Sequence, residues 1–125
     1  NKNRFQVSSL TDNMPVISSW ANDVSYDKIF VEQLKNSLTK SEILIGFSGS
    51  GNSKNIINAY EYAKQTGATC IGFTGNDGGK MKECCDICLQ IPSDDMLTIE
   101  SQHLVVCHCI INLIRSLGNP MFEYK

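Results

Sequence analysis

The chain has 125 residues, of which 42% are hydrophobic and 19% charged, so it has the composition of one folded domain and not of a disordered segment. Its formal net charge of −2 argues against nucleic acid as the main partner, because nucleic-acid-binding domains usually carry a basic stripe. The longest apolar stretches, such as residues 104–117, are interrupted by His, Asn and Arg, and none is expected to reach the ~20 residues of a membrane span. No signal peptide is visible either.

The first predicted element is a helix over residues 26–38, where four apolar side chains recur at helical spacing: Ile29, Phe30, Leu34 and Leu38. Ser25 or Asp27 is placed to cap this helix. A strand over residues 42–47 follows and leads into a loop with the sequence SGSGNS. Five further elements are predicted from periodicity and punctuation: a helix over 53–65 that ends at Gly67, a strand over 69–74, a short helix and a strand over 81–92, and a long helix over 97–117 behind a cap at 93–95.

Strands that alternate with helices predict a doubly wound α/β fold, in which helices cover both faces of a mainly parallel sheet to form a three-layer sandwich. The strands at residues 42–47 and 69–74 are almost continuously apolar, which is typical of strands that are covered on both faces. No internal repeat and no linker divides the chain, so residues 1–125 are expected to form a single domain.

The SGSGNS loop lies where a predicted strand ends and a predicted helix begins, which is where ligands bind in open α/β sheets. Three hydroxyls, from Ser48, Ser50 and Ser53, join the free N–H groups of a helix N-terminus, and Gly49 and Gly51 allow the backbone to approach a ligand closely. The pattern predicts a phosphate-binding loop. The alternative is a Ser/Gly-rich turn without a ligand.

Two better-known phosphate-binding loops do not fit this sequence. Gly46 and Gly51 have the glycine spacing of a nucleotide P-loop, but Asn52 stands in place of the required Lys. Gly49 and Gly51 begin a dinucleotide-binding pattern, but Lys54 stands where its last Gly belongs.

The last predicted helix contains both histidines of the chain, His103 and His108, and Glu100 lies near its start. Glu100 and His108 are two turns apart and lie roughly on one side of the helix. Histidine transfers protons near neutral pH, so these residues are candidates for acid–base chemistry. A histidine on an apolar helix is also compatible with a purely structural place in the core.

Six cysteines lie at positions 70, 84, 85, 88, 107 and 109, mostly within apolar segments. Reduced, buried thiols are the favoured interpretation, and they indicate a cytoplasmic protein. The alternative is a redox or zinc protein that uses Cys84, Cys85 and Cys88, since the last two have the CxxC spacing.

These segments together resemble the sugar isomerase (SIS) domain family. The resemblance is carried by GFSGSGNSKN, by GFTGNDGGKM and by the helix with Glu100, His103 and His108, and it spans nearly the whole chain. The segment WANDVSYDKIFVEQL, which contains Asn22 and Asp23, is similar to the phosphoheptose isomerase subfamily.

The resemblance implies a doubly wound α/β fold of flavodoxin-like topology that assembles into homodimers or homotetramers. It implies an isomerase that interconverts ketose and aldose phosphates through an enediol, with sedoheptulose 7-phosphate as the expected substrate. By match, His108 transfers the proton, and Glu100 orients it or, with His108, holds a metal, since many members contain zinc. The implied substrate contacts are Ser48, Gly49, Ser50 and Ser53 to the phosphate, with Asn22 and Asp23 to the rest of the sugar.

The sequence also departs from the subfamily. The N-terminal region of the family is absent from these 125 residues. Glu100 stands where heptose enzymes carry Gln, and Gly49 replaces a common Thr. A non-catalytic SIS module that binds a phosphosugar and regulates or bridges another protein is therefore the alternative function. Asp77, and with it Asp23, has a simpler interpretation as a turn residue.

Overall fold

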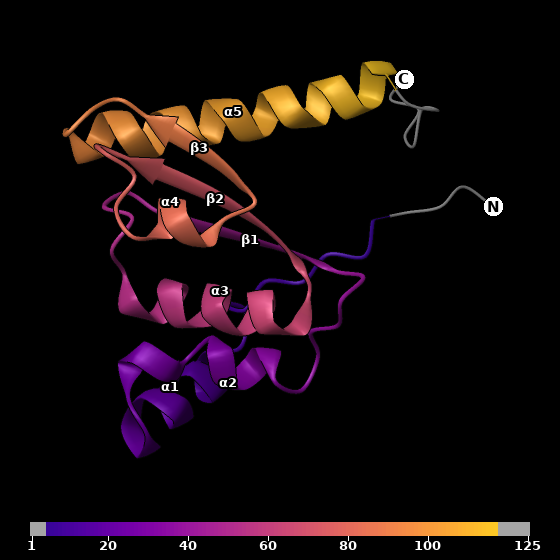
Figure 1. Ribbon diagram of the computed structural model, residues 1–125, viewed down its shortest axis with the longest axis vertical. Helices are drawn as coiled ribbons and strands as arrows, with labels where there is room; N and C mark the ends of the chain where they lie inside the picture. Colours follow the sequence, from indigo (N-terminus) through magenta and orange to yellow (C-terminus); the bar gives the residue numbers. More distant parts are fainter. Residues whose placement is uncertain (1–4, 118–125) are drawn as a thin grey trace.

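A computed structural model describes residues 5–117 of the chain, and a parallel sheet lies at its centre (Figure 1). The sheet consists of β1 (Ile43–Ser48), β2 (Thr69–Gly75) and β3 (Ile87–Ile91), in the order β1-β2-β3. Phe47 of β1 lies opposite Phe73 of β2, and their rings stack with centroids 4.6 Å apart. This parallel sheet confirms the predicted α/β class.

Helices cover both faces of the sheet and create three layers (Figure 1). The helices α3 (Lys54–Thr66) and α4 (Met81–Cys84) lie on one face, and α5 (Met96–Leu117) lies on the other. Two further helices, α1 (Met14–Asp23) and α2 (Val31–Leu34), pack on the outer side of α3. The carboxyl ends of the strands therefore meet the starts of α3 and α5 at one edge of the sheet.

The helix α3 has the bounds that its punctuation predicts. Ser53 is its N-cap residue, and Gly67 ends it in the left-handed conformation with φ of 83°. Tyr60 on its inner face is fully buried and donates a hydrogen bond to the carbonyl oxygen of Ile71 at 2.6 Å. Gly46 makes room for this ring, since a Cβ there would lie 2.8 Å from the Tyr60 hydroxyl. The contact fixes α3 against β1 and β2, next to the SGSGNS loop.

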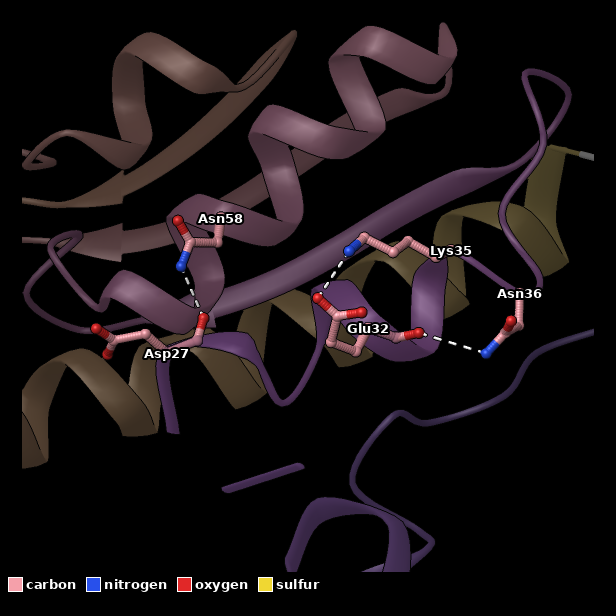
Figure 2. Close-up of polar contacts among 5 residues, drawn as sticks. All are labelled: Asp27, Glu32, Lys35, Asn36 and Asn58. Atoms are coloured by element: carbon pink, nitrogen blue, oxygen red, sulfur yellow. Dashed lines mark hydrogen bonds and ion pairs between the residues drawn. The ribbon is translucent and has the colours of Figure 1, made fainter. Parts of the chain in front are cut away.

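The prediction of one helix over residues 26–38 was wrong. The segment forms a 3-10 turn, η1 (Tyr26–Lys28), followed by the short helix α2. In a continuous helix the carbonyl of Asp27 would accept from the N–H of the fourth residue after it. It accepts instead from the Asn58 side chain of α3 at 2.7 Å (Figure 2). The proposed caps also fail, since the Ser25 side chain makes no capping hydrogen bond and Asp27 lies within η1.

The helix α1 has no counterpart in the sequence analysis. Asn13 caps it, with Oδ1 accepting from the backbone N–H of Val16 at 3.2 Å, and Pro15 lies in the first turn. Both are ordinary helix-start signals, so the Asn-Met-Pro sequence could have predicted the helix.

One face of β1 is open, contrary to the expectation that both faces are covered. Ile43, Ile45 and Phe47 point away from α3 and are 60%, 53% and 48% exposed. The reason is the position of α5, which packs on β2 and β3. The described part of the chain thus leaves an apolar strip beside α5.

The helix α5 has nearly the bounds predicted over residues 97–117, but the expectation that no apolar stretch reaches the length of a membrane span was wrong. The helix has 22 residues, and its most apolar window has a mean hydropathy of 1.4, so by length and composition alone it could cross a membrane. Ile99 and His103 are nevertheless buried against the sheet, as in a helix that covers one face of a domain.

Candidate functional site

The SGSGNS loop connects β1 to α3 at the carboxyl edge of the sheet, as its position in the sequence predicts. Gly51 has a φ of 65°, and its N–H donates to the carbonyl oxygen of Ser48 at 2.9 Å, which closes a tight turn. The hydroxyls of Ser48 and Ser53 are 2.9 Å apart. Ser48 is buried, whereas Ser50 is exposed. The predicted phosphate contacts therefore lie together on one short loop.

Backbone donors at the start of α3 are available to a ligand. In the part of the chain that the structure describes, the N–H groups of Lys54 and Asn55 have no protein acceptor. Ser53 makes no capping bond with its side chain, so its hydroxyl does not occupy these donors. Free N–H groups and the helix dipole favour an anion at this position. The Lys54 ammonium adds positive charge nearby and lies 4.0 Å from the carboxylate of Asp27.

A second loop, residues 75–80, is hydrogen-bonded to the SGSGNS loop. The N–H of Gly75 donates to the carbonyl oxygen of Gly49, and the N–H of Met81 donates to that of Gly51, both at 2.9 Å. Asp77 accepts from the N–H of Gly79 at 3.0 Å, which confirms it as a turn residue. The sequence had suggested no role for Asn52, yet its side chain contacts both loops.

The first turn of α5 packs directly against these loops. Asp95 caps the helix by accepting from the backbone N–H of Thr98 at 2.9 Å and from its hydroxyl at 2.6 Å, and these bonds lower the pKa of the Asp95 carboxyl. Behind the cap, Met96 fills the space that a side chain on Gly49 would need, and Ile99 lies in contact distance of it. Glu100, the residue after Ile99, is exposed.

The two histidines of α5 have different environments. His103 is buried, its Nε2 lies 2.9 Å from the carbonyl oxygen of Thr74, and its ring lies about 6 Å from those of Phe47 and Phe73. It therefore has the structural place that the sequence analysis gave as an alternative. His108 is exposed. It lies about 12 Å along the helix axis from Glu100, given a rise of 1.5 Å per residue.

Asn22 and Asp23, the predicted sugar contacts, are exposed at the end of α1. Their side chains bond to each other at 3.0 Å, and Ser19 donates to Asp23 at 3.3 Å. The following turn reaches the start of α3 through the Asp27–Lys54 pair. The role of Asn22 and Asp23 in sugar binding stays a prediction.

The cysteines give the redox or zinc alternative no support. Burial raises the pKa of the Cys70 thiol to about 11 and that of Cys85 to about 12, and it also raises that of Cys84, so these thiols are protonated at neutral pH. All six cysteines are free. Among residues 5–117, no group of three or more His, Cys, Asp or Glu side chains is arranged to hold a metal ion. Glu100 and His108 alone fall short of the three protein ligands of a zinc site.

The fold and the loop define an α/β domain with a Ser/Gly-rich loop at the carboxyl edge of a parallel sheet, and the hydroxyl and free N–H groups of this loop suit an anion. A family model described as SIS domain matches residues 10–107, so the chain belongs to the SIS domain family. Over 106 residues, 85% of this chain, it is 42% identical to the phosphoheptose isomerase of Burkholderia pseudomallei and 42% identical to that of Aliarcobacter butzleri.

Solved structures agree with the sequence relatives. The phosphoheptose isomerase of Neisseria gonorrhoeae matches with a TM-score of 0.82 and 30% identity, over 84% of this chain and 60% of that one. The enzyme of Francisella tularensis matches with a TM-score of 0.81, also at 30% identity, over 84% of this chain and 56% of that one. The chain spans about half the length of the curated relatives that it matches, 54% and 56% for the two named above.

Proposed function

We propose that the full-length protein is a sugar-phosphate isomerase that converts sedoheptulose 7-phosphate to an aldose heptose 7-phosphate. The observation that carries the proposal is the SGSGNS loop with its unpaired N–H groups, in a chain 42% identical to proteins named phosphoheptose isomerase. Ser48, Gly49, Ser50 and Ser53 hold the phosphate through hydroxyl and backbone donors. Charge-assisted hydrogen bonds of this kind contribute roughly 1.5–3 kcal/mol each.

The reactive end of the sugar then lies away from the loop, along α5. His108 moves the proton between the two carbons of the enediol or between their oxygens, and Glu100 orients the substrate or the imidazole. Asn22 and Asp23 bind hydroxyls between these two ends.

The proposal includes zinc only because this chain offers side chains that can bind it. Glu100 and His108 carry oxygen and nitrogen atoms that suit zinc, and further ligands would have to come from outside residues 5–117. A bound zinc ion would polarise the oxygens of the substrate. Metal analysis of the purified full-length protein, before and after a chelator, tests this point, and protein free of metal with full turnover would contradict it.

The protein is proposed to form a homodimer or homotetramer through α5. Leu104, Val105 and Ile111 on this helix are 59%, 51% and 48% exposed, and the apolar strip of β1 lies beside it. An exposed apolar surface of this extent normally marks an interface, and symmetric assembly of identical chains is the usual solution. Light scattering at micromolar concentration should show the oligomer, and a monomer would contradict it.

The six free thiols support a location in the reducing cytoplasm.

The experiment that tests the function is a substrate screen of the full-length protein. Ketose phosphates of five to seven carbons are incubated with the protein, and the products are identified by NMR. We expect the aldose heptose phosphate to form from sedoheptulose 7-phosphate. Tight binding of these compounds without turnover would contradict the proposal and favour the non-catalytic phosphosugar-binding module.

A further inference from the structure

The Asn52 side chain joins the two loops at the carboxyl edge of the sheet. Its Nδ2 donates to the carbonyl oxygen of Ser50 at 2.9 Å, and its Oδ1 accepts from the backbone N–H of Lys80 at 3.2 Å. Each end of the amide thus has the partner that it requires, and a flipped amide would satisfy neither. The side chain connects two backbone segments that are 28 residues apart in sequence.

The two loops are in backbone-to-backbone contact around this side chain. A Cβ on Gly51 would lie 2.1 Å from the carbonyl oxygen of Gly78, and one on Gly79 would lie 2.6 Å from that of Ser50. No side chain fits between them at these positions. Among the residues that the structure describes, Asn52 provides the only side-chain hydrogen bond between the two loops.

We infer that Asn52 is a positioning residue for the phosphate site, an inference that rests on the proposed function. A carbonyl oxygen that turned toward a phosphate would repel it, whereas hydroxyl and N–H groups attract it. By holding the Ser50 carbonyl, Asn52 keeps the Ser50 hydroxyl, whose oxygen accepts from the Asn52 N–H at 3.2 Å, and the free N–H groups of Lys54 and Asn55 in place before the anion arrives. Donors fixed in advance lose less freedom on binding, which increases affinity.

The residue at position 52 also distinguishes this loop from a nucleotide P-loop. There a lysine at this position reaches the phosphates and supplies charge. Here an uncharged amide is bonded to backbone on both sides, so it acts on the phosphate through Ser50 and does not contact it. The Asn52→Ala variant should therefore affect phosphate affinity through the same donors that Ser50 provides.

The test is a double-mutant cycle on inorganic phosphate binding, measured by calorimetry with the full-length protein. Ser50→Ala and Asn52→Ala should each raise the Kd for phosphate, Asn52→Ala by roughly tenfold, which is the loss of about one hydrogen bond to a charged group. The double variant should bind phosphate only slightly less tightly than the single variant with the higher Kd. The matched control is Asn36→Ala, whose exposed amide donates to the Glu32 carbonyl at 3.4 Å (Figure 2), and its Kd should equal that of the wild type.

The Asn52→Asp variant tests whether Asn52 positions the phosphate donors or only holds the two loops together. The aspartate keeps an oxygen for the N–H of Lys80, but it places a second oxygen against the Ser50 carbonyl. We expect it to fold and to bind phosphate at least as weakly as Asn52→Ala. Wild-type affinity in either Asn52 variant, or effects of Ser50→Ala and Asn52→Ala that simply multiply, would overturn the inference. Unchanged affinity in Ser50→Ala would instead overturn the proposed phosphate site itself.

Discussion

The Nε2 atom of His103 lies 2.9 Å from the carbonyl oxygen of Thr74, at the end of the central strand β2. Thr74 is fully buried and His103 is 6% exposed, so this hydrogen bond is made away from water. It ties α5 to the sheet close to the candidate site. The two histidines of α5 are therefore expected to respond very differently to mutation.

His103→Ala should lower the free energy of unfolding by about 2–4 kcal/mol. The substitution leaves the Thr74 carbonyl without its partner and opens a cavity beside Phe73. His108→Ala, at an exposed position of the same helix, should change it by less than about 0.5 kcal/mol. Urea unfolding of the two variants measures the difference. Equal losses would show that the hydrogen bond to Thr74 does not stabilise the domain.

Ser50→Ala combined with Ser53→Ala should weaken sugar-phosphate binding by roughly tenfold or more, because two donors to a charged group are lost. Calorimetry with the double variant measures the affinity. Thr66→Ala is a suitable control, because its hydroxyl bonds to the Tyr62 carbonyl at 3.0 Å within α3 and lies at the opposite end of that helix. An unchanged affinity in the double variant would rule out the loop as the phosphate site.

Gly51→Ala and Gly67→Ala form a matched pair, since both glycines have positive φ, 65° and 83°. At Gly67 a methyl group meets only the Lys40 side chain at 3.6 Å, so the cost is that of the left-handed conformation, roughly 1 kcal/mol. At Gly51 it would lie 2.1 Å from the Gly78 carbonyl and separate the two loops. Gly51→Ala should therefore destabilise the protein more and weaken phosphate binding, which Gly67→Ala should leave intact. Similar effects of both would mean that the close contact of the loops is unimportant.

The elements that local signals determine could be predicted from the sequence. Ser53 and Gly67 mark the ends of α3, and the position of the SGSGNS loop after an apolar strand is enough to place it at the carboxyl edge of the sheet. In contrast, the helix expected over residues 26–38 is interrupted because Asn58, far along the chain, takes the carbonyl of Asp27. Apolar periodicity contains no information about such a partner.

The residue types of the candidate site could be predicted from the sequence, but the contacts that hold these residues in place could not. The sequence could not distinguish a buried His103 from an exposed His108, because the choice depends on which side of α5 faces the sheet. From the sequence, Asn52 is only a residue that stands where a P-loop has lysine, since its bond to the N–H of Lys80 depends on how the loop after β2 folds back. Nor does the apolar pattern of β1 show that α5 leaves one of its faces open.

The measurement that tests the central claim most directly is the turnover of His108→Asn in the full-length protein with sedoheptulose 7-phosphate. If His108 transfers the proton of the enediol reaction, kcat should fall by ~10²–10⁴, the usual share of general acid–base catalysis. Phosphate affinity should stay at the wild-type value, because the SGSGNS loop lies on another element of the fold. Full turnover in His108→Asn would contradict the account.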